Sequence, residues 1–248
     1  MYMEHTEHVT SRDVFDLRRE GKLDEAYAMA KRLMENPNYS VWDKRAFAWC
    51  LHKMIQVEAK EKVINFERIK TCLNEVFTFG LHNDINFMRY LWGPILTIKE
   101  VEQHIPLYQY ALQLDFTKFE REDYEVKPYK GSDGMMHDWP SLVIRVLRKS
   151  LNSLDKAADK ESIIALLDLA IEHMAYLNES TYYLKWSMAK AYVMLHELDK
   201  AQQIILDLLQ AKPNEFWLWN GLVNTIENDH LLAPVSYTHL TLPTIYSV

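Results

Sequence analysis

The histidines and carboxylates of this chain could do chemistry, but few are spaced as a known site requires. His5 and His8 could bind a metal as a pair on one helical turn, yet they lie in a polar N-terminal segment where solvated side chains are the preferred interpretation. His196 is followed by Glu197, but the second histidine of a zinc-protease motif is missing. We therefore predict no metal site and no cofactor.

The segment around His137 is more suggestive, because His137 and Asp138 adjoin a glycine-containing turn. Asp138 also precedes Trp139-Pro140, an order typical of a helix N-cap, and we prefer capping to a catalytic role. The nearby carboxylates stand among many other charges, which favours a solvated loop over an acid/base pair. They are Glu120, Glu122, Asp123 and Glu125.

Motifs for nucleophilic and phosphate chemistry are also missing. The sequence contains no G-x-S-x-G, Walker or G-x-G-x-x-G motif. Cys50 and Cys72 fall in apolar helical patterns, so buried, reduced thiols are favoured over a disulfide. These observations predict a protein that is not an enzyme, with an active site assembled only in space as the alternative.

The composition indicates which elements hold these residues. The 248 residues include only 6 glycines and 8 prolines, which predicts an all-α fold with helices joined by short links. The net charge of −7 gives no overall attraction to nucleic acid, although it is compatible with a local basic patch. The N-terminus does not resemble a signal peptide and no apolar stretch reaches 18 residues, so we expect a cytoplasmic protein.

Apolar periodicity predicts a helical hairpin near each end of the chain. In the first, the helices on either side of Gly21 are followed by Pro37; in the last, Asp199 caps a helix that Pro213 closes. Further helices are predicted at about 41–60, 65–79, 84–99, 104–114, 138–154, 160–177 and from residue 214 onwards.

This pattern divides the chain into N-terminal helical repeats (1–114), an irregular connecting loop (115–137) and C-terminal helical repeats (138–230). We expect the loop to pack against the helices through its aromatic residues. These are Phe116, Phe119, Tyr124 and Tyr129.

The end hairpins resemble the tetratricopeptide repeat, a 34-residue helix–turn–helix unit. The later copy carries Ala189, Tyr192, Ala201 and Pro213 at pattern positions, whereas residues 60–160 match poorly. The resemblance implies antiparallel helical hairpins stacked as a right-handed solenoid, whose concave face binds protein partners.

Transferring the groove positions of that repeat gives candidate partner-binding residues. They are Arg12, Phe15, Arg18 and Arg19 in the first copy, Lys44 and Phe47 in the second, and Tyr183, Trp186 and Lys190 in the later copy. A basic and aromatic groove suits an acidic peptide through arginine–carboxylate pairs, or single-stranded nucleic acid through base stacking. Ordinary solvated charges and core aromatic residues are the simpler alternative.

A second resemblance concerns four segments, Arg19 to Asn38, Trp42 to Leu51, Phe119 to Glu125 and Asn214 to Trp219. They are similar to the N-terminal helical region of prokaryotic conflict-system proteins that carry S1 or cold-shock-like domains. This implies, as an alternative function, a nucleic-acid-associated module of a defence system. The sequence contains no such β-barrel, so the activity of the barrels is not assigned to this chain.

The C-terminal segment 235–248 is rich in Thr, Ser and Tyr and has no charged residue. Its start, Val235 to Leu240, resembles one reading frame of a transposase adaptor used for sequencing libraries, so we expect a non-native tail, with a genuine disordered or strand-like terminus as the alternative. The preceding apolar helix lacks a partner helix, which predicts the N-terminal fragment of a longer protein. We therefore expect a non-catalytic helical-repeat scaffold that mediates protein–protein interaction and contacts its missing C-terminal part.

Overall fold

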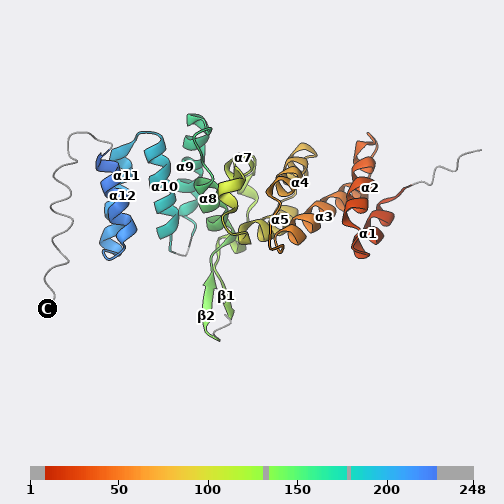
Figure 1. Cartoon of the computed structure of the whole chain (residues 1–248), viewed down its shortest axis with the longest axis horizontal. Helices are drawn as coiled ribbons and strands as arrows, with labels where there is room; N and C mark the ends of the chain where they lie inside the picture. Colours follow the sequence, from red (N-terminus) through yellow and green to blue (C-terminus); the bar gives the residue numbers. More distant parts are fainter. Residues whose placement is uncertain (1–8, 131–133, 178–179, 228–248) are drawn as a thin grey trace, which may run out of the picture. The chain divides into compact units, whose positions relative to one another are not determined.

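The computed structural model describes residues 9–130, 134–177 and 180–227, and these are mostly helical (Figure 1). This confirms the all-α prediction at the level of fold class. The chain divides into two compact units. Unit 1 contains residues up to 105 together with 113–119, and unit 2 contains residues 106–112 and those from 120 onwards. The predicted tail 235–248 and the pair His5 and His8 lie outside the described residues.

Unit 1 begins with three consecutive helices, α1 (Ser11–Arg19), α2 (Leu23–Glu35) and α3 (Val41–Glu58), each of which packs against the others. Gly21 makes the tight turn between α1 and α2, where φ is +81° and a side chain would be strained. The unit continues with α4 (Phe66–Thr78), η1 (Leu81–Asn83), α5 (Ile85–Thr97), α6 (Val101–His104) and η2 (Phe116–Lys118).

The core of unit 1 forms around α3, because one face of this helix is fully buried. The buried side chains include Phe47, Cys50, Leu51 and Ile55. Phe47 lies edge-on to Phe79, with 5.1 Å between ring centroids. Cys50 and Cys72 are free, buried thiols, as predicted.

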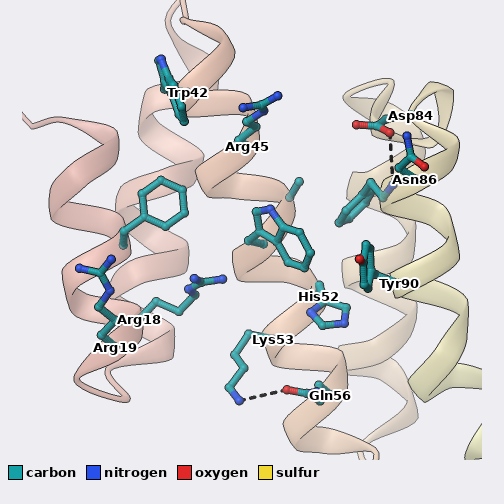
Figure 2. Close-up of a pocket in the computed structure, with 14 residues that line it drawn as sticks. Arg18, Arg19, Trp42, Arg45, His52, Lys53, Gln56, Asp84, Asn86 and Tyr90 are labelled. Carbon is teal, nitrogen blue, oxygen red and sulfur yellow. Dashed lines mark hydrogen bonds between the residues drawn. The ribbon is translucent and has the colours of Figure 1, made fainter.

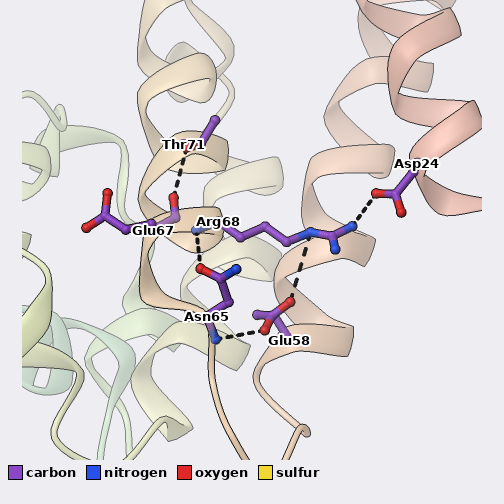
Figure 3. A network of polar contacts seen from close by, with 6 residues as sticks. All are labelled: Asp24, Glu58, Asn65, Glu67, Arg68 and Thr71. Atoms are coloured by element: carbon purple, nitrogen blue, oxygen red, sulfur yellow. Dashed lines mark hydrogen bonds and ion pairs between the residues drawn. The ribbon is translucent and has the colours of Figure 1, made fainter.

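A polar network fixes the helices of unit 1 where α3 ends and α4 begins (Figure 3). Glu58 is 8% exposed; its Oε1 accepts a hydrogen bond of 2.8 Å from Asn65 N, and its Oε2 lies 4.0 Å from Arg68 Nε. Arg68 also pairs with Asp24 on α2. One arginine therefore joins a buried carboxylate and an exposed carboxylate, which sets the position of three helices.

The single helix predicted at 104–114 was wrong. The short helix α7 (Leu107–Ala111) covers the middle of this stretch, whereas α6 ends at its first residue, His104, and Pro106 lies between the two helices. Proline lacks the backbone N–H that a continuous helix needs and disfavours helical geometry at the preceding residue, Ile105.

Unit 2 contains α7, η3 (Arg121–Tyr124), β1 (Lys127–Lys130), β2 (Met136–Trp139), α8 (Leu142–Asn152), α9 (Lys160–Met174), α10 (Tyr182–Met194), α11 (Leu198–Ala211) and α12 (Phe216–Glu227). Consecutive helices from α8 to α12 pack against each other. The last three helices share an apolar core. It includes Ala189, Ile205, Leu208, Leu218 and Leu222.

The predicted irregular loop 115–137 contains regular structure. It holds η2, η3 and the first strand of an antiparallel hairpin, β1–β2. Phe116 and Phe119 are buried, as expected, whereas Tyr129 is 42% exposed and does not pack as predicted.

Asp138 lies in β2 and does not cap a helix, so the capping prediction was wrong. Ser141 caps α8 instead, since its Oγ accepts a hydrogen bond of 3.3 Å from Ile144 N. Pro140 disfavours helical geometry at Trp139, so the helix does not extend back into β2.

Candidate functional site

A pocket of about 920 Å³ opens in unit 1, with walls from α1, α3 and α5 (Figure 2). Two local features position its longest wall. Ser40 caps α3, because its Oγ accepts from Asp43 N at 3.1 Å while Ser40 N donates to Asp43 Oδ2 at 2.8 Å. Residues at helical spacing then share one face of α3, opposite the buried face. They are Trp42, Arg45, Trp49, His52, Lys53 and Gln56.

The other walls come from helices that are also capped. Asp84 caps α5, since its Oδ1 accepts a hydrogen bond of 3.2 Å from Phe87 N. The N-terminus of α1 is held by Thr10, whose N donates to Asp13 Oδ2 at 2.8 Å. The lining residues from these two helices are Phe15, Arg18 and Arg19 on α1, and Asn86, Phe87 and Tyr90 on α5.

Aromatic rings provide most of the apolar surface of this pocket. Trp49 lies 5.4 Å from Tyr90 and 5.3 Å from His52 between ring centroids, so the cluster spans α3 and α5. Trp42 and Tyr90 are 61% and 59% exposed. Exposed aromatic rings at the rim of a pocket are typical of a surface that binds a partner.

The charge of the pocket is positive. Arg18, Arg19, Arg45 and Lys53 line it, and Asp84 is the lining carboxylate. Arg19 is paired with Asp16 at 3.0 Å, so the positive charge of the pocket comes mainly from Arg18, Arg45 and Lys53. The guanidinium of Arg45 lies 5.2 Å from the Trp42 ring centroid, and that of Arg18 lies 5.3 Å from the centroid of Phe15. Cations held over rings in this way are partly desolvated and kept in place, which favours binding of an anionic group.

Two polar side chains of the pocket, His52 and Lys53, can be described in terms of protonation and hydrogen bonding. Burial, together with the positive charges of Arg18 and Lys53, lowers the pKa of His52 below its usual 6.5, so its imidazole is neutral at neutral pH. Lys53 Nζ donates to Gln56 Oε1 at 3.0 Å and stays on the pocket wall.

The structure brings some predicted groove residues together and separates others. Phe15, Arg18 and Arg19 line the pocket, whereas Arg12 is exposed and does not. Lys44 is half-buried, with its Nζ 3.4 Å from Gly80 O. Phe47 cannot face a groove, because it is 0% exposed, and this part of the prediction was wrong.

The groove prediction missed the most prominent lining residues, namely Trp42, Arg45, Trp49 and Tyr90. The α3 members could have been found from their helical spacing alone, since Trp42, Arg45 and Trp49 follow i, i+3, i+7. Tyr90 could not, because its place depends on how α5 packs against α3.

The later groove candidates lie in unit 2, at a different kind of pocket. Trp186 and Lys190 line a cavity of about 360 Å³ between α10, α11 and α12, together with Trp217. Its other walls are mostly apolar, and Lys190 Nζ donates to Asn152 Oδ1 at 2.6 Å. Tyr183 is 51% exposed and stacks on Trp217, with 6.4 Å between centroids.

Unit 2 contains a buried hydrogen bond between a tyrosine and a histidine. Tyr124 Oη and His173 Nδ1 are hydrogen-bonded at 2.8 Å, and His173 is 6% exposed. Burial lowers the pKa of His173 and raises that of Tyr124 to about 12, so both groups are neutral at neutral pH. The contact joins η3 to α9.

In the described parts of the chain, no group of three or more His, Cys, Asp or Glu residues is arranged to hold a metal ion. None of the helices in the described ranges combines the length and apolar character that a bilayer crossing needs.

The described parts of the chain define a mostly helical protein, with a basic aromatic pocket in unit 1 and an apolar pocket in unit 2. Residues 182–236 match a family described as a domain of unknown function (DUF7017), which is less than a quarter of the chain. The match begins with α10 and ends at residue 236, so it includes the first two residues of the predicted foreign tail. No curated protein and no solved structure matches the chain.

Proposed function

We propose that this chain is a non-catalytic scaffold of tetratricopeptide-like helical hairpins, which binds an acidic segment of a protein partner in the pocket of unit 1. One observation carries the proposal: in that pocket Arg18, Arg45 and Lys53 lie beside exposed aromatic rings, while Arg19 is paired with Asp16. An acidic peptide supplies carboxylates for Arg18 and Arg45 and apolar side chains for Trp42 and Tyr90.

The remaining parts of the proposal have separate support. Hairpins α1–α2 and α10–α11 pack as helical pairs joined by short turns, which fits stacked repeats in a right-handed solenoid. Free thiols at Cys50 and Cys72 fit a reducing, cytoplasmic compartment. The resemblance of four segments to conflict-system proteins supplies the biological setting we propose.

The test is the affinity of the full chain for a labelled glutamate-rich peptide that contains one phenylalanine, measured by fluorescence anisotropy. A peptide with glutamine in place of glutamate is its neutral match. We expect the acidic peptide to bind more tightly, and its affinity to fall as the salt concentration rises, because the interaction is between charges at a partly exposed surface.

Variants locate the binding within the molecule. Combining Arg18→Gln and Arg45→Gln removes two cations from the pocket, and we expect the affinity for the acidic peptide to fall about tenfold. The control is Arg32→Gln, which removes an exposed arginine on α2 that does not line the pocket. Equal affinities for the two peptides, or equal losses in the pocket and control variants, would contradict the proposal.

A further inference from the structure

The β1–β2 hairpin exposes every residue of both strands. Figure 1 shows it projecting from the helices of unit 2. An isolated two-stranded ribbon has little stability of its own in water, and a sheet usually buries one face. Here no face is buried, although the hairpin carries Tyr129, Met136 and Trp139. Large apolar side chains held in water on a protruding element indicate an interaction surface.

The register separates the hairpin into two faces of different chemistry. Lys127 pairs with Trp139 and Tyr129 pairs with His137, and alternation along the strands places these side chains on one face. The other face carries the intervening pairs, Pro128 with Asp138 and Lys130 with Met136. The first face therefore has three rings and a cation with no carboxylate. The second has the carboxylate and no aromatic ring.

The rings of the first face, which we call the aromatic face, lie side by side. Tyr129 is 5.6 Å from His137 between ring centroids, with 31° between the planes, and 5.5 Å from Trp139, whose ring is nearly perpendicular to it at 84°. Arg145 on α8 adds a second cation, with its guanidinium 5.1 Å from the Trp139 ring centroid. Tyr129 and Trp139 remain 42% and 38% exposed. The result is a cluster of partly exposed rings, with the planes of Tyr129 and Trp139 nearly perpendicular, beside two positive charges.

We propose that the aromatic face of the hairpin binds single-stranded nucleic acid. Unpaired bases stack on exposed aromatic rings whatever the nucleotide sequence, and the phosphates pair with adjacent cations. An acidic peptide would use Lys127 and Arg145 but would leave the rings without a planar partner. A duplex would present phosphates but no free base faces. This surface is separate from the pocket of unit 1, and the inference does not depend on the peptide proposal.

The experiment uses the full chain and labelled oligonucleotides of roughly 12 nucleotides, within the usual site size of single-strand binding modules. Oligothymidylate, oligouridylate and a duplex of the same length are compared by anisotropy at low salt and then at rising salt. We expect one or both single strands to bind, more tightly than the duplex. The ratio of their affinities shows whether ribose or deoxyribose is preferred. Affinity should fall with added salt.

Two pairs of variants on the same hairpin test the face. Trp139→Ala removes a ring from the aromatic face and should weaken single-strand binding about tenfold, as expected for the loss of one stacked base. Met136→Ala removes an exposed apolar side chain from the opposite face and should leave the affinity unchanged. Lys127→Ala should weaken binding more than Lys130→Ala, because only Lys127 lies beside the rings.

Circular dichroism controls for folding, since all four side chains are exposed and their loss should leave the helical signal unchanged. The proposal is overturned if no single strand binds at low salt or if the duplex binds as tightly. It is also overturned if Trp139→Ala and Met136→Ala have the same effect. Loss of acidic-peptide binding in Trp139→Ala, with oligonucleotide binding intact, would assign the hairpin to a protein partner instead.

Discussion

The pockets of unit 1 and unit 2 both form between packed helices, yet their chemistry is opposite. The pocket of unit 1 is wide, basic and aromatic, and its volume is about 920 Å³. That of unit 2 is about 360 Å³ and mostly apolar, with Trp186 and Trp217 as its main walls. Predicted groove residues near both pockets came from the same positions of the tetratricopeptide-repeat pattern. The repeat pattern alone therefore does not determine the chemistry of the surface.

The difference arises from what packs opposite each groove helix. In unit 2, Gly221 of α12 allows Trp186 to lie directly against the helix backbone, which narrows the space. In unit 1, the aromatic and basic side chains of α3 face α1 and α5 across an open space (Figure 2). A cavity lined by cations can hold an anion, whereas an apolar cavity penalises an unpaired charge.

The largest expected effect is on the free energy of unfolding, and it compares a buried phenylalanine of unit 1 with an exposed one of unit 2. Phe47→Ala in unit 1 empties a fully buried site, and we expect the free energy of unfolding to fall by about 3–5 kcal/mol. The same substitution at Phe216 in unit 2, which is 81% exposed, should change it by less than about 0.5 kcal/mol. Urea unfolding followed by circular dichroism measures both. A loss at Phe47 as small as the one expected at Phe216 would contradict its place in the core.

A smaller effect on the free energy of unfolding is expected for alanine substitutions at two helical glycines, one in each unit. At Gly221, an added Cβ would lie 2.8 Å from Trp186 Cζ3, so Gly221→Ala should destabilise unit 2 by about 1 kcal/mol after the gain in helix propensity. At Gly93 in α5, a Cβ would meet nothing within 4 Å beyond its chain neighbours, but Pro94 follows and disfavours helical geometry at a residue that carries a Cβ. This offsets the gain in helix propensity, so Gly93→Ala should change the stability of unit 1 by less than about 1 kcal/mol.

Thermal unfolding measures the stability of the Gly221→Ala and Gly93→Ala variants. The control for Gly221→Ala is a double variant. Trp186→Ala removes the clashing ring, so adding Gly221→Ala in that background should cause no further loss. If Gly221→Ala destabilises the protein equally with and without Trp186, the close approach of α10 and α12 is not the cause. The narrowness of the apolar pocket would then need another explanation.

These comparisons show which parts of the molecule the sequence could predict. Helices 41–60 and 160–177 were found close to α3 and α9, because each has a regular apolar pattern and a capping residue at its start. The β1–β2 hairpin was missed, since strands that bury neither face leave no alternating apolar pattern. The pocket of unit 1 was found only in part, because Trp49 and Tyr90 meet through packing between helices that are distant in sequence.

Acidification should affect the stability of unit 2 through His173. Burial lowers its pKa in the folded state below the ordinary value of 6.5, so the unfolded chain binds a proton first as the pH falls. The stability present above pH 6.5 should therefore decrease from there downwards, until the folded state is protonated too. His173→Gln should reduce this dependence, as measured by melting temperature against pH. An unchanged pH dependence in the variant would contradict this role.

The smallest expected effect is a change in the pKa of His52 in unit 1, with His173 of unit 2 as the comparison. In unit 1, the charges of Arg18 and Lys53 help to hold the pKa of His52 down, and a bound acidic peptide would offset them. Binding should therefore raise the pKa of His52 towards 6.5, while that of His173 stays unchanged, because His173 does not line that pocket. Titration of both imidazoles by NMR, with and without the peptide, measures the two shifts. By linkage, the peptide should bind more tightly as the pH falls below 6.5. A shift at both histidines would indicate a change throughout the protein, and no shift at His52 would place the acidic peptide outside the pocket of unit 1.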